Sequence, residues 1–99
     1  MILKSLADIT GDAATHALAT DGTKGKWVQF FADPANGASI RVGGADTASG
    51  QGLPIQPGAY QFLPPISDHF EFYDFSKIFY YAGTGDKLYV GYTQEGSNS

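Results

Sequence analysis

The stretch ASIRVGGADTASGQGLPIQPGAYQFLPP, residues Ala38–Pro65, decides the fold. Apolar and polar residues alternate in Ser39–Val42, which is the period of a half-buried strand. Ala45–Gly52 has no bulky side chain, so we expect it to form a loop over the surface. Leu53–Ile55 then returns apolar residues to the chain, and Tyr60–Leu63 predicts a second strand that ends at two prolines. This pattern indicates a β-scaffold with a loop displayed for contact.

The remainder of the chain continues this pattern of short strands and turn signals. Lys26–Ala32 is the clearest central strand, and we expect its Trp27 to be buried. In the last strand Leu88, Val90 and Tyr92 share one face. Strands with turns every eight to twelve residues predict an all-β fold, a small antiparallel β-sandwich of jelly-roll type, as one domain over residues 1–99. Further strands are predicted at His69–Tyr73, with Phe70 and Phe72 on one face, and at Lys77–Ala82.

Two segments near the N-terminus are ambiguous. Residues 1–9 carry scattered apolar positions and favour a short edge strand, which would also be available as a contact arm. Ala14–Thr20 alternates weakly, and its alanines make a helix a competing prediction. The polar end, residues 95–99, is expected to be frayed.

Composition excludes several classes of function. The formal net charge is −4 with six basic residues, which argues against nucleic-acid binding. Cysteine is absent, so disulfides and thiolate metal sites are impossible. No apolar run approaches the roughly 20 residues that span a bilayer, and the first ten residues do not resemble a signal peptide. We therefore expect a soluble protein without a membrane partner.

Candidate chemical sites are weak. His16 and His69 have no converging partners, and the aspartates lie at predicted turns without the alternating acidic run of a calcium loop. The serines lack a nucleophile elbow, and the glycine-rich loops are not followed by helices. We expect no enzyme activity, no metal and no cofactor.

Aromatic residues are concentrated between positions 70 and 81. Strand alternation sends about half of them outward, where an exposed aromatic stripe favours association. Subunit contacts, a sugar-binding platform and a strand buried on both faces are three explanations. Subunit contacts are favoured, because obligate interfaces resemble core surface. The sugar platform is less favoured, because the single tryptophan, Trp27, is expected in a buried strand.

The order of several short motifs resembles the small β-sandwich structural proteins of tailed-bacteriophage virions. These motifs are IRVGG at 40–44, GLPI at 52–55, PG at 57–58, DFSKI at 74–78 and GTGDKLYV at 83–90. The resemblance covers roughly residues 38–92, and each motif also has an ordinary role in turns and strands.

The resemblance implies a decoration (cement) protein that bridges neighbouring major capsid subunits on the capsid exterior and is made in the host cytoplasm. The alternative is a carbohydrate- or receptor-binding module of a tail or fibre. A homo-oligomer is expected, with a trimer favoured over a dimer. The predicted partner contacts are Ile2, Leu3, Leu6, Asp46, Ser49, Gln51, Tyr73, Tyr80 and Tyr81.

Overall fold

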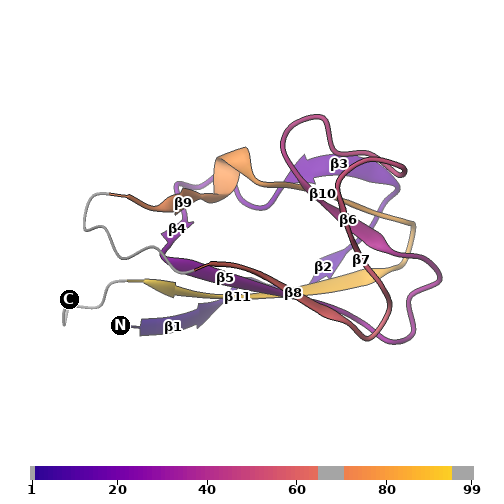
Figure 1. Cartoon of the computed structure of the whole chain (residues 1–99), viewed down its shortest axis with the longest axis horizontal. Coiled ribbons are helices and arrows are strands. Elements are labelled where there is room, and N and C mark those ends of the chain that lie inside the picture. The colour runs from indigo at the N-terminus through magenta and orange to yellow at the C-terminus, as the bar shows by residue number, and fades with distance from the viewer. Residues whose placement is uncertain (1, 65–70, 95–99) are drawn as a thin grey trace.

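The computed structural model describes residues 2–64 and 71–94, and within them the regular secondary structure is β-strand apart from one short 3-10 turn (Figure 1). The strands of the first sheet are β1 (Ile2–Ser5), β2 (Ile9–Thr10), β5 (Trp27–Ala32), β8 (Tyr60–Leu63) and β11 (Lys87–Gln94). Those of the second sheet are β3 (Ala14–Ala17), β6 (Ile40–Gly43), β7 (Leu53–Ile55) and β10 (Phe79–Ala82). A small third pair is β4 (Lys24–Gly25) with β9 (Tyr73–Asp74), and a 3-10 turn, η1, covers Phe75–Lys77.

The two main sheets have the connectivity of a jelly roll. The first has the order β1-β11-β5-β8, with β2 also paired to β11, and the second has the order β3-β10-β6-β7. All pairings are antiparallel, and they are nested along the chain: β2 with β11, β3 with β10, β5 with β8, and β6 with β7. This nesting of eight strands in two sheets defines the jelly-roll architecture. The predicted all-β sandwich is therefore confirmed.

The core lies between the two sheets and follows from strand alternation. In β5 the odd-numbered residues are half-exposed, whereas Val28, Phe30 and Ala32 are fully buried. Leu88, Val90 and Tyr92 share one face of β11, as predicted, and this face points into the core. The opposite sheet and the connecting segments complete the core with Leu18, Ile40, Val42, Ile55, Phe75, Tyr80 and Ala82.

Three predicted elements differ from the structure. Ala14–Thr20 is neither a helix nor a full strand, because β3 ends at Ala17. Residues 71 and 72 lie outside any strand, and the preceding residues of the expected strand at 69–73, Phe70 included, lie outside the described part. Strand β10 begins only at Phe79, because the Asp74 carboxylate accepts from the Ser76 amide and caps a 3-10 turn first.

The small-residue loop is better anchored than its composition predicts. Thr47 is only 3% exposed, and its hydroxyl donates to the Gly44 carbonyl oxygen at 2.6 Å. The Thr15 hydroxyl of β3 in turn donates to the Thr47 carbonyl oxygen at 2.6 Å. Gly43 leaves room for this packing, since a Cβ there would lie 3.0 Å from the Thr47 hydroxyl. The loop is thus fixed to the second sheet.

Candidate aromatic binding face

The solvent side of the first sheet carries a band of mostly aromatic side chains, which we call the aromatic face. It consists of Leu3, Trp27, Gln29, Phe31, Tyr60, Phe62 and Tyr89. Its position follows from β5: because Val28, Phe30 and Ala32 point into the core, their neighbours must point outward. The prediction of a buried Trp27 is therefore wrong.

Strand register brings these side chains into neighbouring rows. Across β5 and β8, Gln29 is paired with Phe62 and Phe31 with Tyr60. Across β5 and β11, Phe31 is paired with Tyr89. Cross-strand partners share a face of the sheet, so residues distant in the sequence form one continuous surface.

The rings of the aromatic face contact one another. The Trp27 and Phe62 ring centroids lie 6.3 Å apart, and those of Phe31 and Tyr60 lie 4.6 Å apart. Phe31 and Tyr89 are stacked at 6.0 Å with an interplanar angle of 22°. These contacts divide the face into a Trp27–Phe62 pair and a Phe31–Tyr60–Tyr89 group.

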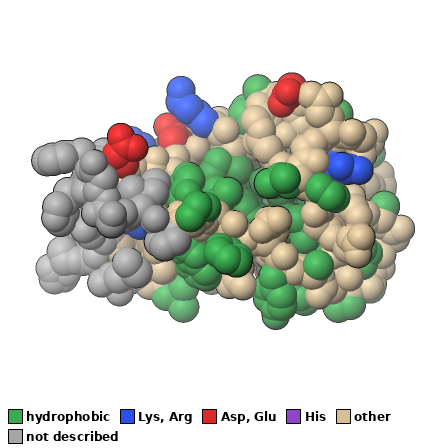
Figure 2. Space-filling model, in the orientation of Figure 1, with side chains coloured by type: hydrophobic (Ala, Val, Ile, Leu, Met, Phe, Trp, Pro, Cys, Tyr) green, Lys and Arg blue, Asp and Glu red, His purple; other side chains and the backbone are tan. Residues whose placement is uncertain are grey.

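Much of this apolar surface is accessible to solvent. Leu3 is 74% exposed, Tyr60 64% and Phe62 55%. In Figure 2 hydrophobic side chains reach the lower edge of the molecule, where Figure 1 places the first sheet, whereas most visible charged side chains lie in the upper half. A contiguous exposed apolar patch of this kind marks a binding surface.

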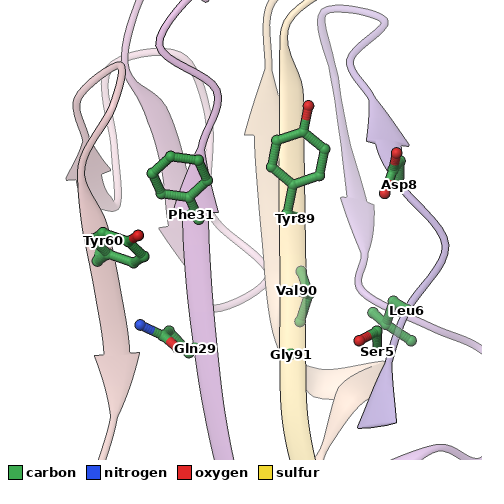
Figure 3. Close-up of a pocket in the computed structure, with 9 residues that line it drawn as sticks. All are labelled: Ser5, Leu6, Asp8, Gln29, Phe31, Tyr60, Tyr89, Val90 and Gly91. Atoms are coloured by element: carbon green, nitrogen blue, oxygen red, sulfur yellow. The ribbon is translucent and has the colours of Figure 1, made fainter.

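A shallow hollow of about 220 Å³ lies on this face above Gly91 of β11. Figure 3 shows Phe31 and Tyr89 side by side on neighbouring strands, with Gln29 on one side of Gly91 and Ser5 on the other. Leu6 and Asp8 line the hollow beyond β1. The glycine opens this space, because it contributes no side chain between Gln29 and Ser5, its register partners.

Tyr89 is held in place by a carboxylate. Its hydroxyl donates to Asp33 at 2.5 Å, and the Ala35 amide donates to the same carboxyl group at 2.8 Å. The hydrogen bond from Tyr89 lowers the pKa of Asp33, and the same bond raises the pKa of Tyr89. The ring at the edge of the hollow is therefore fixed before any ligand binds.

The predicted contact residues do not form one surface. Leu3 lies on the aromatic face, whereas Leu6 packs against the core and lines the hollow beside that face. Strand β1 is paired with β11 at the edge of the first sheet. Ile2 contributes its backbone to β1, and its side chain lies outside the described part. Asp46, Ser49 and Gln51 are exposed on the loop of the second sheet, where the Gln51 amide donates to Asp46 at 2.7 Å.

The three predicted tyrosines lie apart from the aromatic face. Tyr80 is 8% exposed and belongs to the core, so its prediction as a contact residue is wrong. Tyr81, its neighbour on β10, faces the outer side of the second sheet and is half-buried. Tyr73 is half-buried as well, and its hydroxyl donates to the Pro64 carbonyl oxygen at 2.7 Å. Adjacent strand residues point to opposite faces, which separates Tyr80 from Tyr81.

Lys26 has a structural role that the sequence did not suggest. It is 2% exposed, its ammonium donates to the Glu71 carbonyl oxygen, and its Nζ lies 4.1 Å from the centre of the Phe72 ring. Its backbone amide donates to Thr93 at 2.8 Å. Lys26 thus links the segment before β9 to β11 by hydrogen bonds and a cation–π contact.

One histidine and one aspartate of the described residues lie close together. His16 Nε2 lies 2.8 Å from the Asp12 carboxylate at an exposed edge, and this hydrogen bond lowers the pKa of Asp12. Within residues 2–64 and 71–94 no three His, Cys, Asp or Glu side chains are grouped as metal ligands. In the same residues no helix is long and apolar enough to cross a membrane. His69 lies outside the described residues.

Fold and site together define a small jelly-roll domain with an exposed aromatic face. Comparison with family models, curated proteins and solved structures found no match to this chain.

Proposed function

We propose that the chain is a decoration protein of a tailed-bacteriophage capsid and that it docks on the major capsid protein through the aromatic face. The exposure of Leu3, Tyr60 and Phe62 on one side of a single sheet carries this proposal. A protein interface gains most of its affinity from a few large, buried aromatic anchors, and this face presents them already ordered. The motif order of residues 38–92 supplies the virion context.

The mechanism needs no reaction. A specific interface buries about 1,200–2,000 Å², and each bound copy would cover the joint between neighbouring capsid subunits. Many copies on one shell multiply a modest gain per contact, so the shell resists heat and osmotic stress. The low fraction of charged residues, 16%, suits such a surface because fewer charges must lose water on docking.

A homo-oligomer, with a trimer favoured over a dimer, remains part of this proposal. One apolar side chain away from the aromatic face, that of Phe72, is 43% exposed and offers a contact between copies. Sedimentation at tens of micromolar tests this part, and a monomer both in solution and on the particle would contradict it.

Carbohydrate binding is the second candidate, and one observation favours it. Trp27 lies on the exposed face beside Phe62 instead of in the core. Flat aromatic rings on a sheet can stack on sugar rings, and jelly rolls also occur among lectin domains. Such a protein would belong to a tail or fibre and bind a host glycan.

Capsids that lack the protein would distinguish the two functions. Adding the purified chain should give a fixed copy number per particle and a higher temperature of genome release. A glycan array probed with the same chain should stay blank. Unchanged release temperature together with a saturable glycan signal would reject the decoration function and establish its rival.

A further inference from the structure

The hollow above Gly91 differs from the remainder of the aromatic face because it combines rings with polar groups. Phe31 and Tyr89 present nearly parallel rings, 22° apart, and Tyr60 extends the group across β8. Beside these rings lie Gln29 and Ser5. A flat docking surface needs no such recess, so the hollow points to a specific protruding group on the partner.

The polar groups that line the hollow share one property, since each can accept a hydrogen bond. They include the Asp8 carboxylate, the Gln29 amide oxygen and the Ser5 hydroxyl. Among the described residues that line the hollow there is no lysine or arginine, and Asp8 carries the one charged side chain. The whole chain carries a formal charge of −4. Charge and acceptor chemistry therefore match a cationic donor.

We propose that this hollow receives one arginine side chain of the docking partner. This inference rests on the proposed function, because it names the group that anchors the aromatic face to the capsid subunit. A guanidinium is planar and stacks on aromatic rings, and its five N–H groups only donate. The rings of Tyr89 and Phe31 offer the stacking surface, and Asp8, Gln29 and Ser5 offer the acceptors.

A lysine or a sugar would use the hollow less fully. An ammonium is a strongly hydrated point charge, so it gains less from two flat rings than a guanidinium does. A neutral sugar would gain no ion pair from the exposed carboxylate of Asp8. The volume of about 220 Å³ is below the roughly 300–1,000 Å³ of pockets for drug-sized ligands, which fits one side chain.

The site is also ordered in advance. The bond from Tyr89 to Asp33 fixes one ring, and contacts with Tyr89 and Tyr60 on either side fix Phe31. Binding an arginine would therefore immobilise few protein side chains, which lowers the entropic cost of association. Arginine is also one of the residues enriched among interface anchors.

Amide NMR titration of the intact chain tests the inference with three small probes: N-acetyl-arginine methylamide, its neutral citrulline isostere and methyl glucoside. The arginine probe should give saturable shifts at the Gly91 amide and the Gln29 side-chain amide. Asp8→Asn should weaken this binding by roughly two- to fivefold, the effect of an exposed ion pair. Glu71→Gln removes an exposed carboxylate away from the hollow and should leave the affinity unchanged.

Equal binding of citrulline, preferred binding of the glucoside, or no shift at tens of millimolar arginine probe would each overturn the assignment. Binding of the unmodified chain to capsids that lack the protein is measured in parallel. This measurement shows whether the arginine assignment or the decoration function has failed. A chain that binds capsids but not arginine has a different anchor. A chain that binds arginine but no capsid would contradict the decoration function alone.

Discussion

The ring of Trp27 lies 6.3 Å from the ring of Phe62 on the solvent side of the sheet, and neither belongs to the core cluster. Both pack on a sheet whose other face already fills the core with Val28, Phe30 and Ala32. The pair is thus not required to complete the interior. Surface rings that the fold does not need for its interior are best explained by contact with a partner.

Phe75 should be essential for stability although it lies in a short 3-10 turn. It is completely buried and meets Tyr92 edge-on at 5.0 Å. Phe75→Ala should lower the free energy of unfolding by about 3–5 kcal/mol, because the cavity is enclosed. Phe62→Ala removes an identical phenyl ring from the surface and should change the free energy of unfolding by no more than about 0.5 kcal/mol. Urea unfolding of both variants measures the contrast, and equal losses would contradict the core assignment.

The Tyr89–Asp33 hydrogen bond should make stability depend on pH at both extremes. It lowers the pKa of Asp33 below the ordinary value of 3.8, so its contribution is present above that pH and is lost as the pH falls through the lower folded value. It raises the pKa of Tyr89 above 10.0, so on the alkaline side the contribution is lost as the pH rises through the higher folded value.

Asp33→Asn tests this dependence. The variant should be less stable than the parent chain at pH 6, and the difference in melting temperature should shrink as the pH falls below 3.8. Tyr89→Phe removes the same bond, so a double variant should lose less than the sum of the two single changes. A difference that stays constant from pH 6 to strong acid would refute the role of the Asp33 charge.

Thr47 should matter more than any other side chain of its loop. Thr47→Ala removes a buried hydroxyl that donates to Gly44, at an expected cost of about 1 kcal/mol. Ser49→Ala, at an exposed position two residues along, should cost almost nothing. Chemical denaturation of the pair measures this difference. Equal stabilities of Thr47→Ala and Ser49→Ala would show that the Thr47 hydroxyl does not fix the loop to the second sheet.

In β11, strand alternation predicted which residues share a face. In β5 it could not show which face is buried, because both faces carry apolar residues. Leu88, Val90 and Tyr92 share one face of the last strand, as predicted, and all three are buried. In Lys26–Ala32 either phase looks apolar, and a slip of one residue exchanges core and surface. Because the strand was expected to be buried with Trp27 inside it, the sequence did not predict the aromatic face.

The position of Lys26 bears on which face of β5 is buried, but the sequence alone allows two interpretations of it. Lys26 shares the phase of Val28 and Phe30, so accepting them as buried requires a buried lysine. A buried lysine is reasonable here only because the Phe72 ring and the Glu71 carbonyl oxygen lie beside the Lys26 ammonium. Both groups belong to a segment about 45 residues further along the chain. Long-range contacts of this kind cannot be read from local pattern. The anchoring of the loop by Thr15 and Thr47 is a second example.

The most direct test of capsid docking compares two surface substitutions of nearly equal exposure. Phe62 on the aromatic face is 55% exposed, and Leu53 on the second sheet is 53% exposed. Phe62→Ser and Leu53→Ser should leave the melting temperature nearly unchanged, since neither side chain belongs to the core. Affinity for capsids that lack the protein should fall at least about tenfold in Phe62→Ser, the loss of one strong interface anchor, and stay at the parent value in Leu53→Ser. Equal affinities for the two variants, or a loss confined to Leu53→Ser, would contradict docking through the aromatic face.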